Sequence, residues 1–295
     1  MKRRNFIGYT LLFVGGCTTA TDVPQASTTD NNISTELTFT VTDLLSLEKL
    51  ERDFEAFRVA LEDVLECSVT FYPVESYTEA AAALQSGDLD LALTGPSEYV
   101  LIRARMNAIP VIAITRPNYR SIIVVPTDNS IQTLADLKGK TIAMREVGST
   151  SGHLRPTKLL LDAGLDPKQD YNVQMLDRAG LEALKNGEVD AWAGPLSDFE
   201  RFLSDEGFSE NDFSVLEKSP PLPNDVFVFN SNTDPAAIEA FRELTIEHQD
   251  ELIEAIASVP ENDKYETSEL VSVQDSDYDT IRDAYRAVGQ GEFLD

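Results

Sequence analysis

The stretch GSTSGH at residues 148–153 follows a predicted strand at 141–144 and precedes a predicted helix that begins near residue 151. A strand, a turn and a helix form the repeating unit of an α/β fold. At the start of such a helix several backbone N–H groups have no intrahelical acceptor, and together with the helix dipole they form an anion site. Ser and Thr at this place also occur as ordinary helix caps, so the turn alone fits both interpretations.

Predicted strands and helices alternate on both sides of this turn. The predicted strands lie at residues 36–41, 68–74, 89–94, 109–115, 120–126, 140–144, 172–176, 189–193 and 226–230. The predicted helices lie at residues 44–65, 77–85, 97–105, 131–137, 151–163, 181–186, 235–246, 249–257 and 277–288. Such alternation predicts an α/β fold with mainly parallel sheets covered by helices, built as two blocks with the second inserted into the first.

This arrangement is typical of a two-lobed binding protein. We expect residues 36–122 and 225–295 to form lobe 1, and residues 123–224 to form lobe 2. The chain would cross between the lobes near residues 119–125 and 221–228, and these crossings would act as a hinge. Ligands of such sheets bind at the carboxyl ends of the strands, beside helix N-termini. We therefore expect a ligand in the cleft between the lobes.

The chain is strongly acidic. Its 295 residues include 24 Lys and Arg but 51 Asp and Glu, which gives a formal net charge of −27. A surface of this charge argues against nucleic acid as a partner and against charge-driven binding to an anionic membrane. It does not exclude an anionic ligand, because donors within a site act at short range while distant surface charge is screened.

The first 17 residues have the features of an export signal. Basic residues 2–4 precede a short apolar run at 6–14, and the sequence VGGC that ends at Cys17 resembles the lipobox of bacterial lipoproteins. We expect a signal peptide at residues 1–17, lipid attachment at Cys17, a flexible tether at residues 18–35 and an anchored extracytoplasmic protein. An ordinary signal peptide with a chance cysteine is the alternative, and a resemblance to twin-arginine signals leaves the export route open.

Cysteine and histidine are rare in this chain. The cysteines are Cys17 and Cys67, and the histidines are His153 and His248. With Cys17 lipidated, Cys67 has no disulfide partner, and we interpret it as a small buried apolar residue. Two separated histidines predict neither a metal cluster nor a histidine-based catalytic group, and no nucleophile–base pair or cofactor lysine motif is present. We therefore predict a protein that is not an enzyme and that binds no metal or cofactor.

Four segments resemble, in order and spacing, the substrate-binding proteins of phosphonate, phosphite and phosphate ABC importers. The segments are Tyr77 with the Ala-rich helix and GDLDLALTGP after it (77–96), NYRSIIVV (118–125), LADLKGK followed by GSTSG and Pro156 (134–156), and NGEVDA followed by PND (186–191 and 223–225). The resemblance covers residues 36–294. It implies the type II periplasmic binding protein fold, in which two lobes with mixed, mainly parallel sheets are joined by a hinge.

The resemblance also implies ligand contacts at matching positions. Tyr77 and Tyr119 match the two pocket tyrosines of the family, whose hydroxyls would donate to phosphoryl oxygens. Ser149, Thr150 and Ser151 match the hydroxyl turn that holds the phosphoryl group. Charge-assisted hydrogen bonds to an oxyanion are roughly twice as strong as neutral ones, so a few convergent donors suffice. Each tyrosine is otherwise a half-buried aromatic residue at a strand end.

Other positions depart from the family or match it in a less obvious way. Asp225 matches a pocket aspartate, which would accept a proton from a P–OH group or a ligand amine, and a turn residue facing solvent is the alternative. A family histidine is missing from the sequence LDRAG at 176–180, where Arg178 either replaces the lost donor or lies exposed in a loop. The acidic residue with which family members bind aminoalkylphosphonates is missing or shifted at 195–198, which argues against that ligand.

These observations predict a lipid-anchored substrate-binding component of an ABC importer. It would capture a phosphonate, phosphite or phosphate ion between its lobes and deliver it to a membrane permease, and we expect it to be a monomer. A ligand-sensing subunit of a membrane signalling system and a binder of another small oxyanion are the alternatives. Transport or sensing, and the identity of the oxyanion, stay open at this point.

Overall fold

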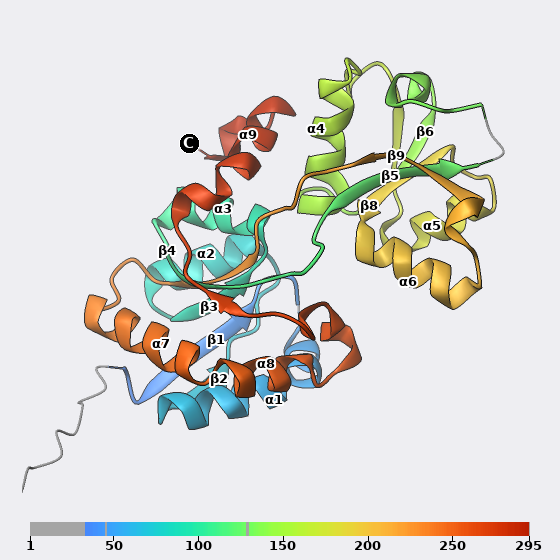
Figure 1. Ribbon diagram of the computed structural model, residues 1–295. Helices are drawn as coiled ribbons and strands as arrows, with labels where there is room; N and C mark the ends of the chain where they lie inside the picture. The colour runs from blue at the N-terminus through green and yellow to red at the C-terminus, as the bar shows by residue number, and fades with distance from the viewer. Residues whose placement is uncertain (1–32, 45, 128–129, 295) are drawn as a thin grey trace, which may run out of the picture. The chain divides into compact units, whose positions relative to one another are not determined.

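The computed structural model describes residues 33–44, 46–127 and 130–294, which belong to one compact unit, Asn32–Asp295 (Figure 1). The predicted signal peptide, the predicted lipid attachment at Cys17 and nearly all of the predicted tether lie outside these residues. Within them, no helix combines the length and the apolar character needed to span a membrane.

The described residues form six strands of a first sheet. Its strands are β1 (Glu36–Val41), β2 (Ser68–Phe71), β3 (Leu91–Thr94), β4 (Ile109–Ile114), β10 (Asp225–Phe229) and β11 (Leu270–Val271). Their order is β11-β4-β10-β3-β1-β2, and β1 pairs in parallel with both β2 and β3. The pairs that join β10 to β3, β10 to β4 and β11 to β4 are antiparallel. The sheet is therefore mixed, with a parallel core to which a late part of the chain returns.

Helices cover both faces of the first sheet. One face carries α1 (Leu47–Leu65), α7 (Pro235–Glu247) and α8 (Gln249–Ala257), and the other carries α2 (Tyr77–Ser86), α3 (Pro96–Met106) and α9 (Asp279–Ala287). The core under α1 is rich in phenylalanine: the ring centroid of Phe57 lies 5.7 Å from that of Phe39 and 5.8 Å from that of Phe227. Burial of these large apolar rings stabilises the packing of α1 against the first sheet.

In the part of the chain that the structure describes, the second sheet has five strands in the order β7-β6-β8-β5-β9. Its strands are β5 (Ser121–Pro126), β6 (Thr141–Met144), β7 (Asn172–Met175), β8 (Ala191–Pro195) and β9 (Phe213–Lys218). β6 pairs in parallel with β7 and β8, whereas β5 is antiparallel to β8 and β9. α4 (Arg155–Asp162) covers one face, and α5 (Gly180–Lys185) and α6 (Leu196–Glu206) cover the other. Two mixed sheets, each with a parallel core, confirm the predicted α/β architecture.

Most predicted elements are present, with ends that differ by a few residues. Helix α6 and strands β9 and β11 have no counterpart among the predicted elements. The apolar residues Leu196, Phe199 and Leu203 of α6 have helical spacing and are buried, so the signal for this helix is present in the sequence. The helix predicted at 131–137 is a short 3₁₀ turn, η1 (Leu134–Leu137), because the chain becomes extended directly after it.

The chain crosses from the first sheet to the second after β4 and returns before β10 (Figure 1). The two crossing segments, residues 115–120 and 219–224, lie side by side. The backbone N–H of Leu222 donates to the carbonyl oxygen of Tyr119 over 2.9 Å, which ties the segments together. We call the first sheet with its helices the first half, and the second sheet with its helices the second half.

Candidate functional site

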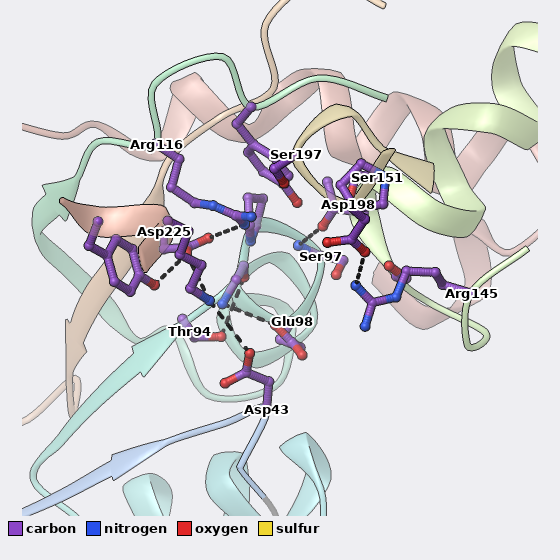
Figure 2. Close-up of a pocket in the computed structure, with 18 of the residues that line it drawn as sticks. Asp43, Thr94, Ser97, Glu98, Arg116, Arg145, Ser151, Ser197, Asp198 and Asp225 are labelled. Carbon is purple, nitrogen blue, oxygen red and sulfur yellow. Dashed lines mark hydrogen bonds and ion pairs between the residues drawn. The ribbon is translucent and has the colours of Figure 1, made fainter. Parts of the chain in front are cut away.

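A polar cavity lies where strand ends of both halves face one another (Figure 2). Its lining comes from the ends of β1 and β3, the start of α3, the crossing segment 115–120, the turn at 148–153, the start of α6 and the 3₁₀ helix η5 (Pro260–Tyr265). The cavity has a volume of about 190 Å³. Pockets for drug-sized ligands measure roughly 300–1,000 Å³, so this one fits a small ligand.

The turn at 148–153 is held in shape by its own side chains. Ser149 Oγ accepts from the N–H of Gly152 over 3.3 Å, and His153 Nδ1 accepts from the N–H of Gly148 over 3.1 Å. Burial lowers the pKa of His153, so the imidazole stays neutral and able to accept this bond. The turn is therefore preorganised by contacts that do not involve a ligand.

The helix after this turn begins with a wide π-helical turn, η2 (Thr150–Leu154), and continues as α4. The N–H groups of Thr150 and Ser151 stand at the helix start, where no intrahelical acceptor is available. The side chains of both residues are buried and line the cavity. A Cβ at Gly152 would lie 2.5 Å from Arg145 Cβ, so only glycine lets the turn pack this closely against its neighbour.

Tyr119 lies beside this turn. Its side chain is 8% exposed, and its phenol interacts with the hydroxyls of Thr150 and Ser151. Burial raises the pKa of Tyr119, and the charge of Arg116 and the two hydroxyls oppose that rise only in part, so the phenol keeps its proton and can donate. The structure thus places one pocket tyrosine next to the hydroxyl turn, as the resemblance implies.

The start of α3 offers few donors to an anion. Pro96 carries no N–H, and the N–H of Gly95 donates to Glu98 Oε2 over 3.0 Å. The N–H of Ser97 donates to Thr150 Oγ1 over 3.0 Å, which joins the start of α3 in the first half to η2 in the second. Because the Thr150 oxygen accepts this bond, its hydroxyl proton points away from Ser97, and the same hydroxyl interacts with the Tyr119 phenol.

Asp225, the first residue of β10, is 3% exposed. Its Oδ2 accepts from the Tyr265 hydroxyl over 2.6 Å, and its Oδ1 lies 3.4 Å from Nη1 of Arg116 (Figure 2). The carboxylate therefore holds a tyrosine and an arginine in the wall of the cavity. Asp225 is one of the predicted contact residues, whereas Arg116 and Tyr265 belong neither to a periodic pattern nor to a matched motif position, and so the sequence does not reveal them.

Glu98, in the first turn of α3, is partly buried and lines the cavity. Burial, and then the negative charges of Asp43 and Asp225, raise the pKa of Glu98 to about 8, while the Gly95 N–H and Lys264 oppose this rise. Glu98 therefore carries a proton at neutral pH. The protonated carboxyl removes one negative charge from the cavity wall.

The second half contributes further charged residues. Arg145 Nε lies 2.8 Å from Asp177 Oδ1, and its Nη1 lies 3.1 Å from Asp198 Oδ2. Asp198 belongs to the stretch 195–198, where the family's acidic residue is expected; it lines the cavity but is paired with Arg145. Arg178 is exposed at the rim of the same cavity, and no described residue provides a partner for its guanidinium.

The structure gathers most of the predicted contact residues around one cavity. The predicted residues that line it are Tyr119, Ser149, Thr150, Ser151, Arg178 and Asp225. Tyr77 is the first residue of α2, but its side chain lies outside the described part of the structure. Among the residues that the structure describes, no three His, Cys, Asp or Glu side chains are grouped so that they could hold a metal ion. The ligand contacts themselves stay predictions.

Known proteins resemble this chain along most of its length. The family described as "ABC transporter, phosphonate, periplasmic substrate-binding protein" matches residues 39–283. The phosphate-import protein PhnD of Mycolicibacterium smegmatis is 26% identical over 298 residues, which cover 92% of this chain and 91% of that protein. The tetrathionate sensor histidine kinase TtrS of Salmonella typhimurium is 26% identical over 153 residues, 48% of this chain and 26% of its own length. The structure of PhnD1 from Prochlorococcus marinus in complex with methylphosphonate shares the fold, with a TM-score of 0.67, 19% identity and coverage of 87% of this chain and 99% of that chain.

Proposed function

We propose that this chain, which belongs to the phosphonate family of periplasmic ABC-transporter substrate-binding proteins, captures a phosphorus oxyanion in the cavity between its two halves. Membership of this family makes it the substrate-binding component of a phosphonate or phosphate importer, a role without catalysis. The ligand that we infer is a phosphate, phosphite or phosphonate ion, held by the turn at 148–153 and by Tyr119.

One observation carries the proposal: donors of different kinds converge on one small cavity. Thr150 and Ser151 supply hydroxyls and backbone N–H groups, and Tyr119 supplies a phenol from the crossing segment. A tetrahedral oxyanion presents acceptors in several directions and matches such a set. The helix dipole behind the turn adds a favourable potential, and charge-assisted bonds are roughly twice as strong as neutral ones.

The acidic side chains of the cavity do not oppose an anion as strongly as their number suggests. Asp198 is paired with Arg145, and Asp225 is paired with Arg116. Glu98 holds its proton at neutral pH because its pKa is raised to about 8. Pairing and protonation therefore weaken the repulsion that these three carboxyl groups exert on an anion beside the hydroxyl turn.

Contacts between the halves support capture by closure. Arg201 of α6 donates to both carboxylate oxygens of Asp263 in η5, over 2.8 and 2.7 Å. With the bond from Ser97 to Thr150, this ion pair bridges the cavity from two sides. We propose that the two crossing segments form the hinge between two lobes, which correspond to the two halves, and that the closed form docks on a membrane permease.

The periplasmic location follows from the family, and we further propose a lipid anchor at Cys17. The observation behind it is the sequence VGGC after a short apolar run. Metabolic labelling with a fatty acid that carries a detectable tag tests the anchor. The full chain should incorporate the label, and a Cys17→Ala variant should not; equal labelling of both would contradict the proposal.

Isothermal titration of the purified protein with phosphate, phosphite, methylphosphonate and 2-aminoethylphosphonate tests the ligand class, with sulfate as a tetrahedral anion of different chemistry. We expect saturable binding of at least one phosphorus oxyanion, about tenfold or more tighter than that of sulfate. Thr150→Ala should weaken it, whereas Thr127→Ala, an exposed threonine outside the cavity, should not. Folded protein that binds none of these ions would remove this ligand class.

A sensing role is the second candidate, because part of a sensor histidine kinase resembles about half of this chain. An importer subunit and a sensor subunit need the same closed, ligand-bound form, so ligand binding alone does not distinguish the two roles. An experiment in living cells does. Deletion of the gene should abolish uptake of the labelled oxyanion if the protein serves import. Normal uptake combined with loss of a transcriptional response to the ion would favour sensing.

A further inference from the structure

We propose that Arg116 is the charged anchor of the oxyanion and that Asp225 is the residue that positions it. This inference rests on the proposed function, since it assigns the residue that neutralises the ligand in the same cavity. Arg116 lies in the crossing segment 115–120, at the junction of the two halves, and is not among the positions that the family resemblance singles out.

Arg116 has more donors than acceptors. A guanidinium carries five N–H groups, and this side chain is only 15% exposed. Its one side-chain acceptor in the described parts of the chain is Asp225 Oδ1, at a long 3.4 Å. The remaining N–H groups belong to a side chain that lines the cavity, and no described side chain accepts from them. An oxyanion bound there would supply the missing acceptors.

The guanidinium is also held in place by contacts within the protein. Its carbon lies 3.6 Å from the ring centroid of Tyr119, which supports one face of the group. Asp225 fixes one edge, and the Tyr265 hydroxyl in turn fixes Asp225 over 2.6 Å. Figure 2 shows Arg116 and Asp225 pointing toward one another at the cavity wall. A group that is already ordered loses little entropy when it binds, which favours tight capture.

The other cations of the cavity are less suited to this role. Arg145 is engaged by two aspartates, and Arg201 is engaged by both oxygens of a third. Lys264 Nζ lies 3.9 Å from Asp43 Oδ2 and 4.0 Å from Asp225 Oδ2. Arg178 is exposed at the rim of the cavity. The N–H groups of Gly95 and Ser97 at the start of α3 are also engaged, which leaves Arg116 as the mostly buried cation best placed to meet an anion on this side of the cavity.

Titration of the full-length protein with phosphate and methylphosphonate tests the assignment. Arg116→Gln should weaken binding by about 10- to 100-fold, as expected for the loss of one or two charge-assisted bonds, and Arg116→Lys should recover part of the loss. Arg286→Gln, which removes an exposed arginine of α9 outside the cavity, serves as the matched control and should change affinity less than about threefold. Equal losses in the two glutamine variants would overturn the proposal.

A second variant and a second readout separate anchoring from folding. Arg116→Gln leaves Asp225 buried without its cation, so the double variant Arg116→Gln/Asp225→Asn keeps this pair neutral and should fold while binding as weakly as the single variant. The salt dependence of the dissociation constant should also become shallower, which a purely structural residue would not cause. Wild-type affinity in the double variant, with an unchanged salt dependence, would overturn the role of Arg116 while leaving the proposed function intact. If the wild-type protein binds no oxyanion at all, the proposed function fails first and this inference fails with it.

Discussion

Replacing Glu98 by glutamine should raise the stability of the protein in alkaline solution and leave it nearly unchanged in acid. The Gln amide oxygen can still accept from the Gly95 N–H, as Glu98 Oε2 does over 3.0 Å, so the α3 start keeps its shape. What the variant removes is a carboxyl whose pKa is raised to about 8, first by burial and then by the charges of Asp43 and Asp225.

The sign and size of this effect follow from proton linkage. In the unfolded chain a glutamate loses its proton near its ordinary pKa of 4.5, whereas folded Glu98 keeps it until about pH 8. The folded state thus binds more protons between these values, so the contribution of Glu98 is fully present below pH 4.5 and is lost as pH rises through 8. At about 1.4 kcal/mol per pH unit, the wild type should lose about 3–6 kcal/mol relative to Glu98→Gln across this window.

Urea unfolding of both proteins at pH 5, 7 and 9 measures the difference. The free energy of unfolding of Glu98→Gln minus that of the wild type should grow steadily with pH and level off above pH 8. Glu254→Gln, on the exposed face of α8, is the matched control and should show no such trend. A difference for Glu98→Gln that stays constant within about 1 kcal/mol from pH 5 to pH 9 would refute the account of a protonated carboxyl in the cavity.

Three further predictions concern the turn and its neighbour. Tyr119→Phe keeps the ring against Arg116 but removes the hydroxyl group. The free energy of oxyanion binding, measured by calorimetry, should weaken by about 1–3 kcal/mol with little change in melting temperature. Unchanged affinity would mean that the Tyr119 hydroxyl does not contact the ligand. Gly152→Ala places a Cβ 2.5 Å from Arg145 Cβ and should lower the free energy of unfolding by about 1–3 kcal/mol in urea titrations; a variant as stable as the wild type would show that the turn has room to adjust. Burial lowers the pKa of His153, so below the ordinary value of 6.5 the unfolded chain binds a proton that the folded chain does not. The urea concentration at the unfolding midpoint should therefore decrease as the pH is lowered from 7.5 to 5.5. His153→Gln should reduce this fall, and an equal fall in both proteins would assign it to other groups.

The strand–turn–helix unit was predictable because every part of it is local. The strand at Thr141–Met144, the glycines of the turn and the helix that follows are determined by alternation, small residues and helical spacing. The position of Tyr119 near the turn follows from the matched segment. The Arg116–Asp225 pair was not predictable in the same way, because its members are 109 residues apart and meet only when the chain returns to the first sheet. The raised pKa of Glu98 likewise depends on burial that no local pattern reveals.

The register of the first sheet explains how the distant part of the site is placed. Asp225 pairs with Ile114 at the end of β4, two residues before Arg116, and a slip by one residue would turn its carboxylate to the opposite face of the sheet. Asp225, which contacts both Arg116 and Tyr265, is therefore placed by the pairing of β10 with β4. The hydroxyl turn belongs to the second half and meets this group through the bond between Thr150 and the start of α3. Since the first half carries Asp225, which positions the cation, and the second half carries the hydroxyls, neither half alone holds a complete site, and we expect tight binding only when the two are brought together.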